Sequence, residues 1–394
     1  MARHEQVLPG GLRFTDLVSL GALAEHVPLS TIREVVTAEG RSEKRVRLLP
    51  ADVTALYVVA MWLFRDVSYE EVLNCLLAGL RWAGLALESV ATKGAITQAR
   101  VRLGWQAMRA LYLRLARPLA TSETRGAWYR SWLTVAIDGS TFDVPDTEAN
   151  AAEFGYPGTA RGSSAYPQIR CLALSETGTH AVFACQMDSI KRGETTLAKD
   201  LLAALKPGML LLADRAFFGY ELWTAAAATK ADLLWRVKKN IRLPVKERLA
   251  DGSFLSEIHR SGNDIRDGRA GLAVRVVEYT VGGGKEVFRL ITTILDPRKA
   301  PALELAALYP QRWEIEAAFD EIKTHIKGSK ITMRSKTPEL VRQEFWGLMI
   351  AHWALRDIIH AAALRQNLDP DGISFVHAVR LVRRMMPRTA DFSP

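Results

Sequence analysis

The chain is organised around one stretch, Tyr309-Pro310-Gln311-Arg312-Trp313-Glu314-Ile315-Glu316, which continues to Lys323. Its pattern predicts a helix over about residues 309–326, with the proline tolerated in the first turn. At about 100° per residue, Tyr309, Arg312, Glu316 and Lys323 fall within an arc of about 60°. The adjoining arc gives the helix an apolar face to bury, formed by Ile315, Ala318, Phe319, Ile322 and Ile326.

One carboxylate on this helix is framed by two cations and a phenol. Such a set suits a site that holds a metal ion and grips phosphates. The alternative is a solvated helix face with ion pairs between residues four apart, such as Arg312 and Glu316. The choice between these interpretations depends on the rest of the chain.

The composition favours a large protein with a polyanionic partner. At 394 residues we expect two or three domains, and the hydrophobic content of 48% supports a sizeable core. The net charge of +9 favours a polyanion but does not separate DNA, RNA and anionic lipid. No signal peptide or bilayer-spanning apolar run is visible, so we expect a cytoplasmic protein.

The cysteines support neither a zinc site nor a disulfide framework. Cys75, Cys171 and Cys185 are far apart, each in an apolar run, and no CxxC or His/Cys cluster occurs. This pattern is typical of buried free thiols in a reducing cytosol.

Residues 1–125 have helical patterns, and we expect a helical N-terminal DNA-binding domain there. The patterns cover residues 14–25, 30–38, 50–64, 69–80 and 96–119. A Thr-Lys-Gly joint at 92–94 precedes a basic helix that carries Arg100 and Arg102. A helix-turn-helix would need such a helix to enter the major groove of DNA. The same residues also fit a basic helix that simply faces water.

Two apolar strands each lead to an aspartate. Residues 132–137 precede Asp138, and residues 209–213 precede Asp214. A carboxylate at the C-terminal end of a buried strand can project into a crevice, whereas the alternative is an ordinary turn aspartate. Around them we expect a loop at 143–162, strands at 168–175, 180–188 and 233–237, and helices at 194–205 and 219–229. We expect the strands at 132–137, 168–175 and 180–188 to form an antiparallel meander.

The pattern of residues changes twice in the last third of the chain. Residues 272–279 and 286–294 alternate between apolar and polar, and we expect an all-β insertion over residues 238–300. Its glycine run at 282–284 fits a hairpin turn better than a phosphate cradle, because no strand-to-helix context surrounds it. The catalytic core would thus comprise 126–237 and 301–365, with a helix from about 338 to 365. Residues 366–394 form a basic C-terminal helix and tail.

The three acids Asp138, Asp214 and Glu316 would, if they meet, hold two divalent metal ions. Magnesium prefers oxygen ligands and keeps positions open for water and phosphate. Two such ions about 4 Å apart can activate a nucleophile and stabilise the leaving oxygen of a phosphodiester. Basic side chains would bind backbone phosphates and position DNA without reading it, namely Arg312, Lys323, Arg215, Arg236 and Lys238.

The spacing of Tyr309, Arg312, Glu316 and Lys323, Y-x2-R-x3-E-x6-K, resembles the signature of the insertion-sequence-four family of bacterial DDE transposases. Residues 137–140, Ile-Asp-Gly-Ser, look like that family's first acidic motif. Residues 212–217, Leu-Ala-Asp-Arg-Ala-Phe, look like its second. The β-rich insertion is also family-like, and the resemblance covers roughly residues 50–360 with no missing element.

The resemblance implies an α/β fold with a ribonuclease H-like mixed sheet core, a helical N-terminal domain and an all-β insertion. It also implies cut-and-paste DNA transposition. Asp138, Asp214 and Glu316 would be the catalytic metal ligands, holding two Mg²⁺ ions, with Mn²⁺ as a substitute. Water activated in this site would nick the transposon end. The freed 3′-hydroxyl would attack the opposite strand, giving a hairpin, and finally the target DNA.

The same resemblance assigns DNA contacts and partners. Tyr309, Arg312 and Lys323 would grip phosphates near the cleaved end. Relatives flip a base there and stack it on an aromatic side chain, for which Phe288 or Trp235 are candidates. A homodimer on terminal inverted repeats in the bacterial nucleoid is implied. Two alternatives stay open: a nuclease on the same core without strand transfer, and a non-catalytic transposase-derived DNA-binding protein.

Overall fold

The computed structural model describes residues 26–42, 49–80, 91–159, 162–280, 286–328 and 332–385. The helix expected at 14–25 and the glycine turn at 282–284 lie outside these residues. Every helix in the described part is too short or too polar to cross a membrane.

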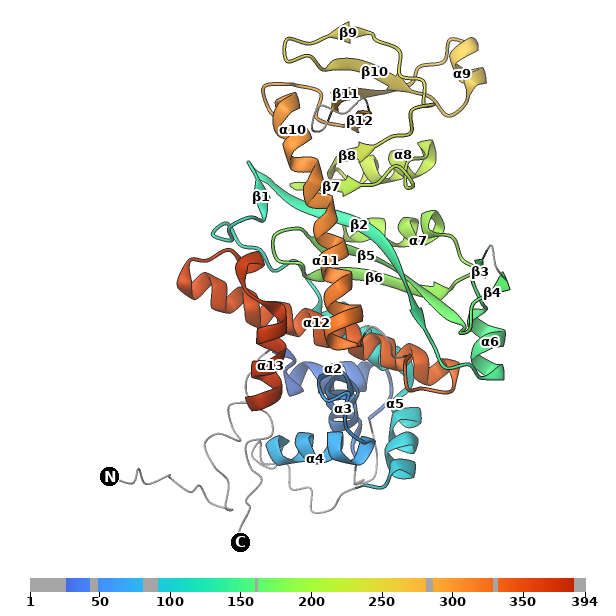
Figure 1. The fold of residues 1–394 in the computed structure, drawn as a ribbon, viewed down its shortest axis with the longest axis vertical. Helices are drawn as coiled ribbons and strands as arrows, with labels where there is room; N and C mark the ends of the chain where they lie inside the picture. The colour runs from blue at the N-terminus through green and yellow to red at the C-terminus, as the bar shows by residue number, and fades with distance from the viewer. Residues whose placement is uncertain are drawn as a thin grey trace.

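A mixed sheet forms the centre of the molecule (Figure 1). Its first five strands run in the order third, second, first, fourth, fifth. The first three pair antiparallel as the expected meander, and the last two run parallel to the first. This topology confirms the ribonuclease H-like core. The strands are β2 (Trp132–Asp143), β5 (Gln168–Glu176), β6 (Val182–Ser189), β7 (Met209–Ala213) and β8 (Asp232–Arg236), and β1 (Trp128–Tyr129) pairs with β2.

The insertion continues this sheet. Its strand β12 (Val287–Thr292) pairs antiparallel with β8, so the core and the insertion share one hydrogen-bonded ladder. The sheet then extends outward through β11 (Leu272–Thr280), β10 (Phe254–Ile258) and β9 (Glu247–Arg248). One short helix, α9 (Gly262–Arg266), lies between β10 and β11, so the insertion is β-rich with one helical turn.

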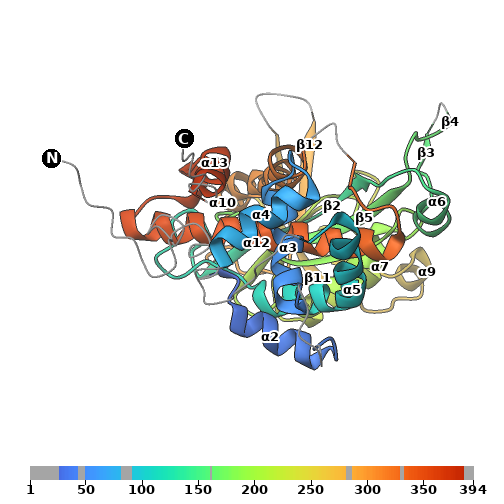
Figure 2. The ribbon, with the colours of Figure 1, turned by 90° about the horizontal axis from the view of Figure 1, so that it is seen from below.

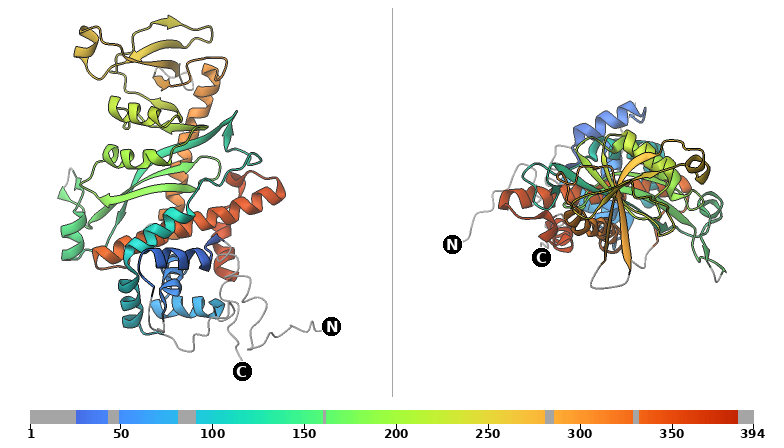
Figure 3. Two further views of the ribbon diagram at one scale, coloured as in Figure 1. Left: turned by 180° about the vertical axis from the view of Figure 1, so that it is seen from behind. Right: turned by 90° about the horizontal axis from the view of Figure 1, so that it is seen from above.

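Strand β7 explains how both faces of the sheet are covered. Leu211 and Ala213 pack with α7 (Glu194–Leu201) and α8 (Tyr220–Ala228), which Figure 3 shows in front of the sheet. Leu210 and Leu212 pack on the opposite face against α10 (Ala302–Leu308). A strand covered on both faces is apolar at every position, which is why its sequence predicted its bounds correctly. A short 3₁₀ turn, η2 (Leu202–Ala204), follows α7.

The helix that carries the signature begins earlier than predicted, at Ala302, and changes geometry twice. After α10 the backbone tightens to the 3₁₀ segment η3 (Tyr309–Trp313), continues as α11 (Glu314–Asp320) and widens to the π-helical segment η4 (Glu321–Ile326). Pro310 therefore lies inside the helix and not in its first turn. Proline lacks an amide hydrogen and crowds the carbonyl four residues back, so a 3₁₀ stretch surrounds it. The predicted apolar face is buried as expected.

The N-terminal helices pack around the long helix α12 (Pro338–Gln366), as Figure 2 shows from below. Trp62 donates its indole N–H to the Glu344 carbonyl at 2.7 Å, which ties the two parts together. α5 kinks at Gly104, whose φ is 74°. The elements are α2 (Leu29–Ala38), α3 (Ala51–Leu63), α4 (Tyr69–Leu80), α5 (Lys93–Leu115) and, after the turn η5 (Pro370–Gly372), α13 (Phe375–Met385).

The segment 143–162 contains structure where a loop was predicted. Helix α6 (Glu148–Phe154) begins after Thr147, whose hydroxyl accepts the amide N–H of Asn150 at 3.3 Å. A threonine N-cap before an alanine-containing run stabilises a short helix. The adjacent strands β3 (Gly158–Thr159) and β4 (Gly162–Ser163) form a small separate pair.

Candidate active site

Asp138 lies on β2, and Asp214 directly follows the neighbouring strand β7, where the parallel pairing of the two strands ends. The last paired residues are Ile137 of β2 and Ala213 of β7, so the aspartates come next in the same register row. Parallel strands lie about 4.8 Å apart, so these residues are neighbours. Asp138 does not end its strand as predicted, because β2 continues along β5 to Asp143. On the other side of β2, the strand β7 stops at Ala213, so its pairing with β2 ends at Ile137.

Arg312 links Asp138 to Glu316. Its buried guanidinium donates from Nη1 to Oδ2 of Asp138 at 3.3 Å and from Nη2 to Oε1 of Glu316 at 3.1 Å. The other oxygen of Asp138 accepts the Gly139 amide N–H at 2.7 Å. Burial raises the pKa of Asp138, although the Gly139 amide and the Arg312 guanidinium act in the opposite direction. The strand acid and the helix acid therefore share one cation.

Lys323 faces the same strand one step further on. Its Nζ donates to Oγ of Ser140 at 3.2 Å, two residues beyond Asp138. Tyr309, at the other end of the signature, donates its hydroxyl to the Ala213 carbonyl at 3.2 Å. Burial raises the pKa of Tyr309. The signature residues thus all lie toward β2 and β7.

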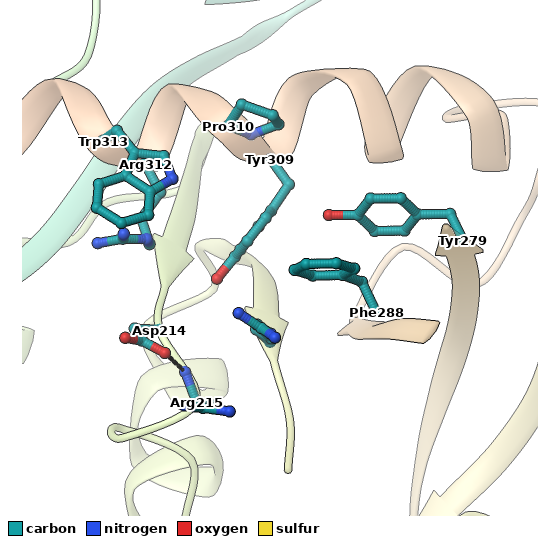
Figure 4. A pocket seen from close by; sticks show the side chains of 9 residues that line it. Asp214, Arg215, Tyr279, Phe288, Tyr309, Pro310, Arg312 and Trp313 are labelled. Carbon is teal, nitrogen blue, oxygen red and sulfur yellow. Dashed lines mark hydrogen bonds between the residues drawn. The ribbon is translucent and has the colours of Figure 1, made fainter. Parts of the chain in front are cut away.

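A cavity of about 460 Å³ opens beside Asp214 (Figure 4). Its floor contains Asp214, whose carboxylate accepts the backbone N–H of Arg215. Tyr309 projects into it, and Trp313 lies beside Arg312 at its edge. The lining residues are Asp214, Arg215, Arg236, Tyr279, Phe288, Tyr309, Pro310, Arg312 and Trp313.

The far wall of this cavity is aromatic. Phe288 of β12 and Tyr279 of β11 stack with ring centroids 5.4 Å apart, and the Cζ of Arg236 lies 4.2 Å from the Phe288 centroid. Trp313 is 58% exposed with the Arg312 Cζ 4.3 Å from its ring, so it does not serve core packing. Tyr279 was missed from the sequence. It pairs directly with Phe288 across the β11–β12 ladder, so the neighbour of that candidate on the partner strand was the residue to consider.

Two residues predicted to contact DNA, Arg100 and Trp235, are buried in the structure, which argues against both assignments. Arg100 is 3% exposed and donates to Gln343 Oε1 at 2.9 Å and Ser335 Oγ at 3.0 Å, so it joins α5 to the α12 region. It lies on the buried side of α5. Trp235 is 1% exposed and packs edge-to-face with Trp223, which leaves no ring face for a base. Lys238 and Arg215 are exposed and Arg102 is partly exposed, and for these three the assignment stays a prediction.

The donor set fits a divalent metal ion, since three carboxylates offer the oxygen ligands that hard cations prefer. In this conformation Arg312 lies between Asp138 and Glu316, so an incoming cation competes with its guanidinium. Within the described residues a different group, His180, Glu314 and Asp371, has ligand atoms that all lie within 4.8 Å of one another. Arg356 Nη2 lies 2.6 Å from Nδ1 of His180, so a positive charge already stands next to that group.

Comparison with known protein families supports the family resemblance found in the sequence. Residues 17–113 match the family model described as insertion element 4 transposase N-terminal. Residues 133–354, more than half of the chain, match the model described as transposase DDE domain.

The chain is similar to transposase InsG for insertion sequence element IS4 of Escherichia coli strain K12, with 28% identity covering 95% of this chain and 85% of the relative. It is 30% identical to putative transposase InsZ of the same organism, covering 50% of this chain and 64% of that relative. The piggyBac transposase synaptic complex with hairpin DNA aligns at a TM-score of 0.48 and 12% identity, covering 93% of this chain and 80% of that chain. The chain therefore belongs to the insertion element 4 family of DDE transposases: it is a DNA transposase, an enzyme that binds DNA and uses divalent metal ions.

Proposed function

We propose that this transposase moves an insertion sequence by cut-and-paste chemistry, with Asp138, Asp214 and Glu316 as catalytic carboxylates for two Mg²⁺ ions, Mn²⁺ being an acceptable substitute. The observation that supports it most is the bond pattern of Arg312, which contacts both Asp138 and Glu316 beside the residue row that contains Asp214. Bound divalent cations would activate the attacking water and stabilise the leaving oxygen.

The residues around the acids would position the DNA. Once cations neutralise Asp138 and Glu316, Arg312 is released to bind a phosphate near the cleaved end. Lys323, on the β2 side, and Arg215, on the cavity side, extend this cationic surface. After the first nick, the 3′-hydroxyl would attack the opposite strand to form a hairpin, and the reopened end would attack target DNA.

The aromatic cavity suits a base flipped out of the transposon end. Phe288 offers one ring face there, and Arg236 lies against it. Replacing Phe288 with alanine should slow cleavage by roughly 10- to 100-fold, because base stacking on an aromatic side chain contributes about 1–3 kcal/mol. The measurement is single-turnover cleavage, together with the fluorescence of 2-aminopurine placed at successive positions near the end.

Tyr166→Ala is the matched control, because Tyr166 is also an exposed aromatic residue but does not line the cavity. It should leave both signals unchanged. Unaltered 2-aminopurine fluorescence and cleavage in Phe288→Ala would transfer the stacking role to Trp313.

The partners follow from the same reaction. We propose that a homodimer pairs the terminal inverted repeats of its element and then captures target DNA, in the nucleoid of a bacterial cytoplasm. In this scheme residues 1–125 bind DNA with Arg102 among the contacts. The core segments 126–237 and 301–365 carry the chemistry, the insertion 238–300 contributes Phe288 and Lys238, and residues 366–394 form a basic tail.

A strand-transfer assay tests the proposal. A precleaved end with a free 3′-hydroxyl, a target plasmid and Mg²⁺ should give a joined product that EDTA abolishes. A nuclease on the same core would cut the uncleaved end but give no joined product. A non-catalytic DNA-binding protein would shift the end in a gel and yield neither product.

A further inference from the structure

Glu321 is a buried carboxylate on the signature helix, five residues beyond Glu316 and outside the four-residue signature. It is 6% exposed. Its partners come from two other elements. From α12, the Arg356 guanidinium binds both carboxylate oxygens, with Nε to Oε2 at 2.8 Å, and His352 Nε2 lies 3.0 Å from Oε2. From the turn between β5 and β6, His180 Nδ1 lies 3.2 Å from Oε1.

His180 holds the same helix at a second point. Its Nε2 lies 3.0 Å from Oε2 of Glu314, so one imidazole contacts the helix on both sides of Glu316. The exposed Asp371 also approaches Nε2, at 3.3 Å. His180 has a φ of 55°, a left-handed conformation that is uncommon outside glycine and is often found at functional sites. The charged cluster thus ties the helix to α12 and to the sheet.

Glu321 also stands where the helix changes geometry. It is the first residue of the π segment, in which the Lys327 amide bonds back to the Ile322 carbonyl five residues earlier at 2.9 Å. A π turn is wider than an α turn, so the starting point of the segment sets the direction of the side chains after it. Lys323 is the third residue of the segment and reaches Ser140 on β2.

We propose that Glu321 is a positioning residue for the transposition reaction. Held by Arg356, His352 and His180, it fixes the start of the π segment and so aims Lys323 at the phosphate beside the scissile bond. The inference rests on the proposed role of Lys323. Because a buried ion cluster also contributes to stability, the test separates the position of Lys323 from the folding of the chain.

The test is a double-mutant cycle in the full chain, measuring single-turnover cleavage of an element end at saturating DNA. Glu321→Gln should lower the cleavage rate about 10- to 100-fold, since misplacing a group by about 1 Å costs up to that much. The KM for the DNA end should change little. In the Lys323→Ala background, Glu321→Gln should have almost no further effect, because the two residues act through one contact.

Glu344→Gln provides the matched control. Glu344 is a buried carboxylate on α12 that accepts the backbone amides of Arg334 and Ser335, each at 2.9 Å, away from the π segment. Its effect should add to that of Lys323→Ala. The pair Glu321→Met with Arg356→Met removes both charges at similar volume, and we expect it to stay folded, which circular dichroism checks.

Additive effects of Glu321→Gln and Lys323→Ala would overturn the inference. So would a wild-type cleavage rate in the folded Met pair, because the cluster would then serve stability alone. A wild-type chain that cleaves no element end with Mg²⁺ contradicts the proposed function itself, and the inference falls with it.

Discussion

Replacing Glu316 with alanine is expected to reduce Mg²⁺-dependent cleavage of an element end by about 10³- to 10⁴-fold. In the proposed site the Glu316 carboxylate holds a cation that lowers the free energy of the transition state by several kcal/mol. Each 1.36 kcal/mol corresponds to about a tenfold change in rate. The measurement is single-turnover cleavage of a labelled end. Binding of the same DNA, followed by gel shift, should persist, because the variant removes a negative charge.

Asp320→Ala is the control on the same helix. Asp320 has an exposed side chain whose carboxylate accepts the Thr324 hydroxyl at 2.6 Å and lies 3.5 Å from His325 Nε2, so cleavage should stay at the wild-type rate. Cleavage that survives Glu316→Ala but is lost in a neighbouring acid variant would show that another carboxylate completes the set. The assignment of the three acids would then be wrong.

The second large effect concerns stability, and it comes from the insertion. Asp251→Ala should lower the free energy of unfolding by about 3–5 kcal/mol, because it leaves the buried Arg275 charge without its carboxylate. Arg275 is fully buried and also donates to Ser253 Oγ at 2.8 Å and to the Ala300 carbonyl at 2.7 Å. Asp251 further accepts the amide N–H of Ala302, the first residue of α10, at 2.8 Å. Urea denaturation followed by circular dichroism measures the loss.

The pH dependence of this contribution has a definite sign. Burial alone raises the pKa of Asp251, but hydrogen bonds from Ser253 and the Ala302 amide lower it overall. A lowered carboxyl pKa adds stability that is complete above the ordinary value of 3.8 and is lost as the pH falls through the lowered value. The difference in stability between wild type and Asp251→Ala should therefore shrink in acid.

Asp267→Ala is the comparison for the stability measurement, since Asp267 is an exposed aspartate in the same insertion. It should change stability by less than about 0.5 kcal/mol. Adding Arg275→Met to Asp251→Ala should recover part of the loss, because no charge is then buried unpaired. A stable Asp251→Ala single variant would mean that Ser253 and the backbone carbonyls suffice for Arg275.

Much of the core could be predicted from local pattern. Residues 209–213 are apolar at every position because both faces of β7 are covered, and Asp214 follows directly. The signature spacing placed Arg312 and Lys323 on one side of a helix, and both contact β2. These features depend on neighbours in sequence or on helical periodicity, which a single chain displays.

The errors come from features that depend on distant contacts. Asp138 lies inside β2, which continues to Asp143 along β5, and only its pairing with β7 ends there. The sequence around Asp138 carries no sign of where the pairing with β7 ends. Arg100 became an internal residue because Gln343 and Ser335, far along the chain, satisfy its guanidinium. Pro310 suggested a helix start, although the apolar residues before it continue the helix backward to Ala302.

The shared ladder between β8 and β12 has a mechanical consequence. The far wall of the cavity, with Phe288 on β12, and its floor, with Asp214 after β7, belong to one hydrogen-bonded sheet in which β7 pairs with β8 and β8 with β12. Moving the far wall away from the floor would break main-chain hydrogen bonds, so we expect the two to move together. If a base is extruded as proposed, we therefore expect the DNA, and not this part of the protein, to deform when the complex forms.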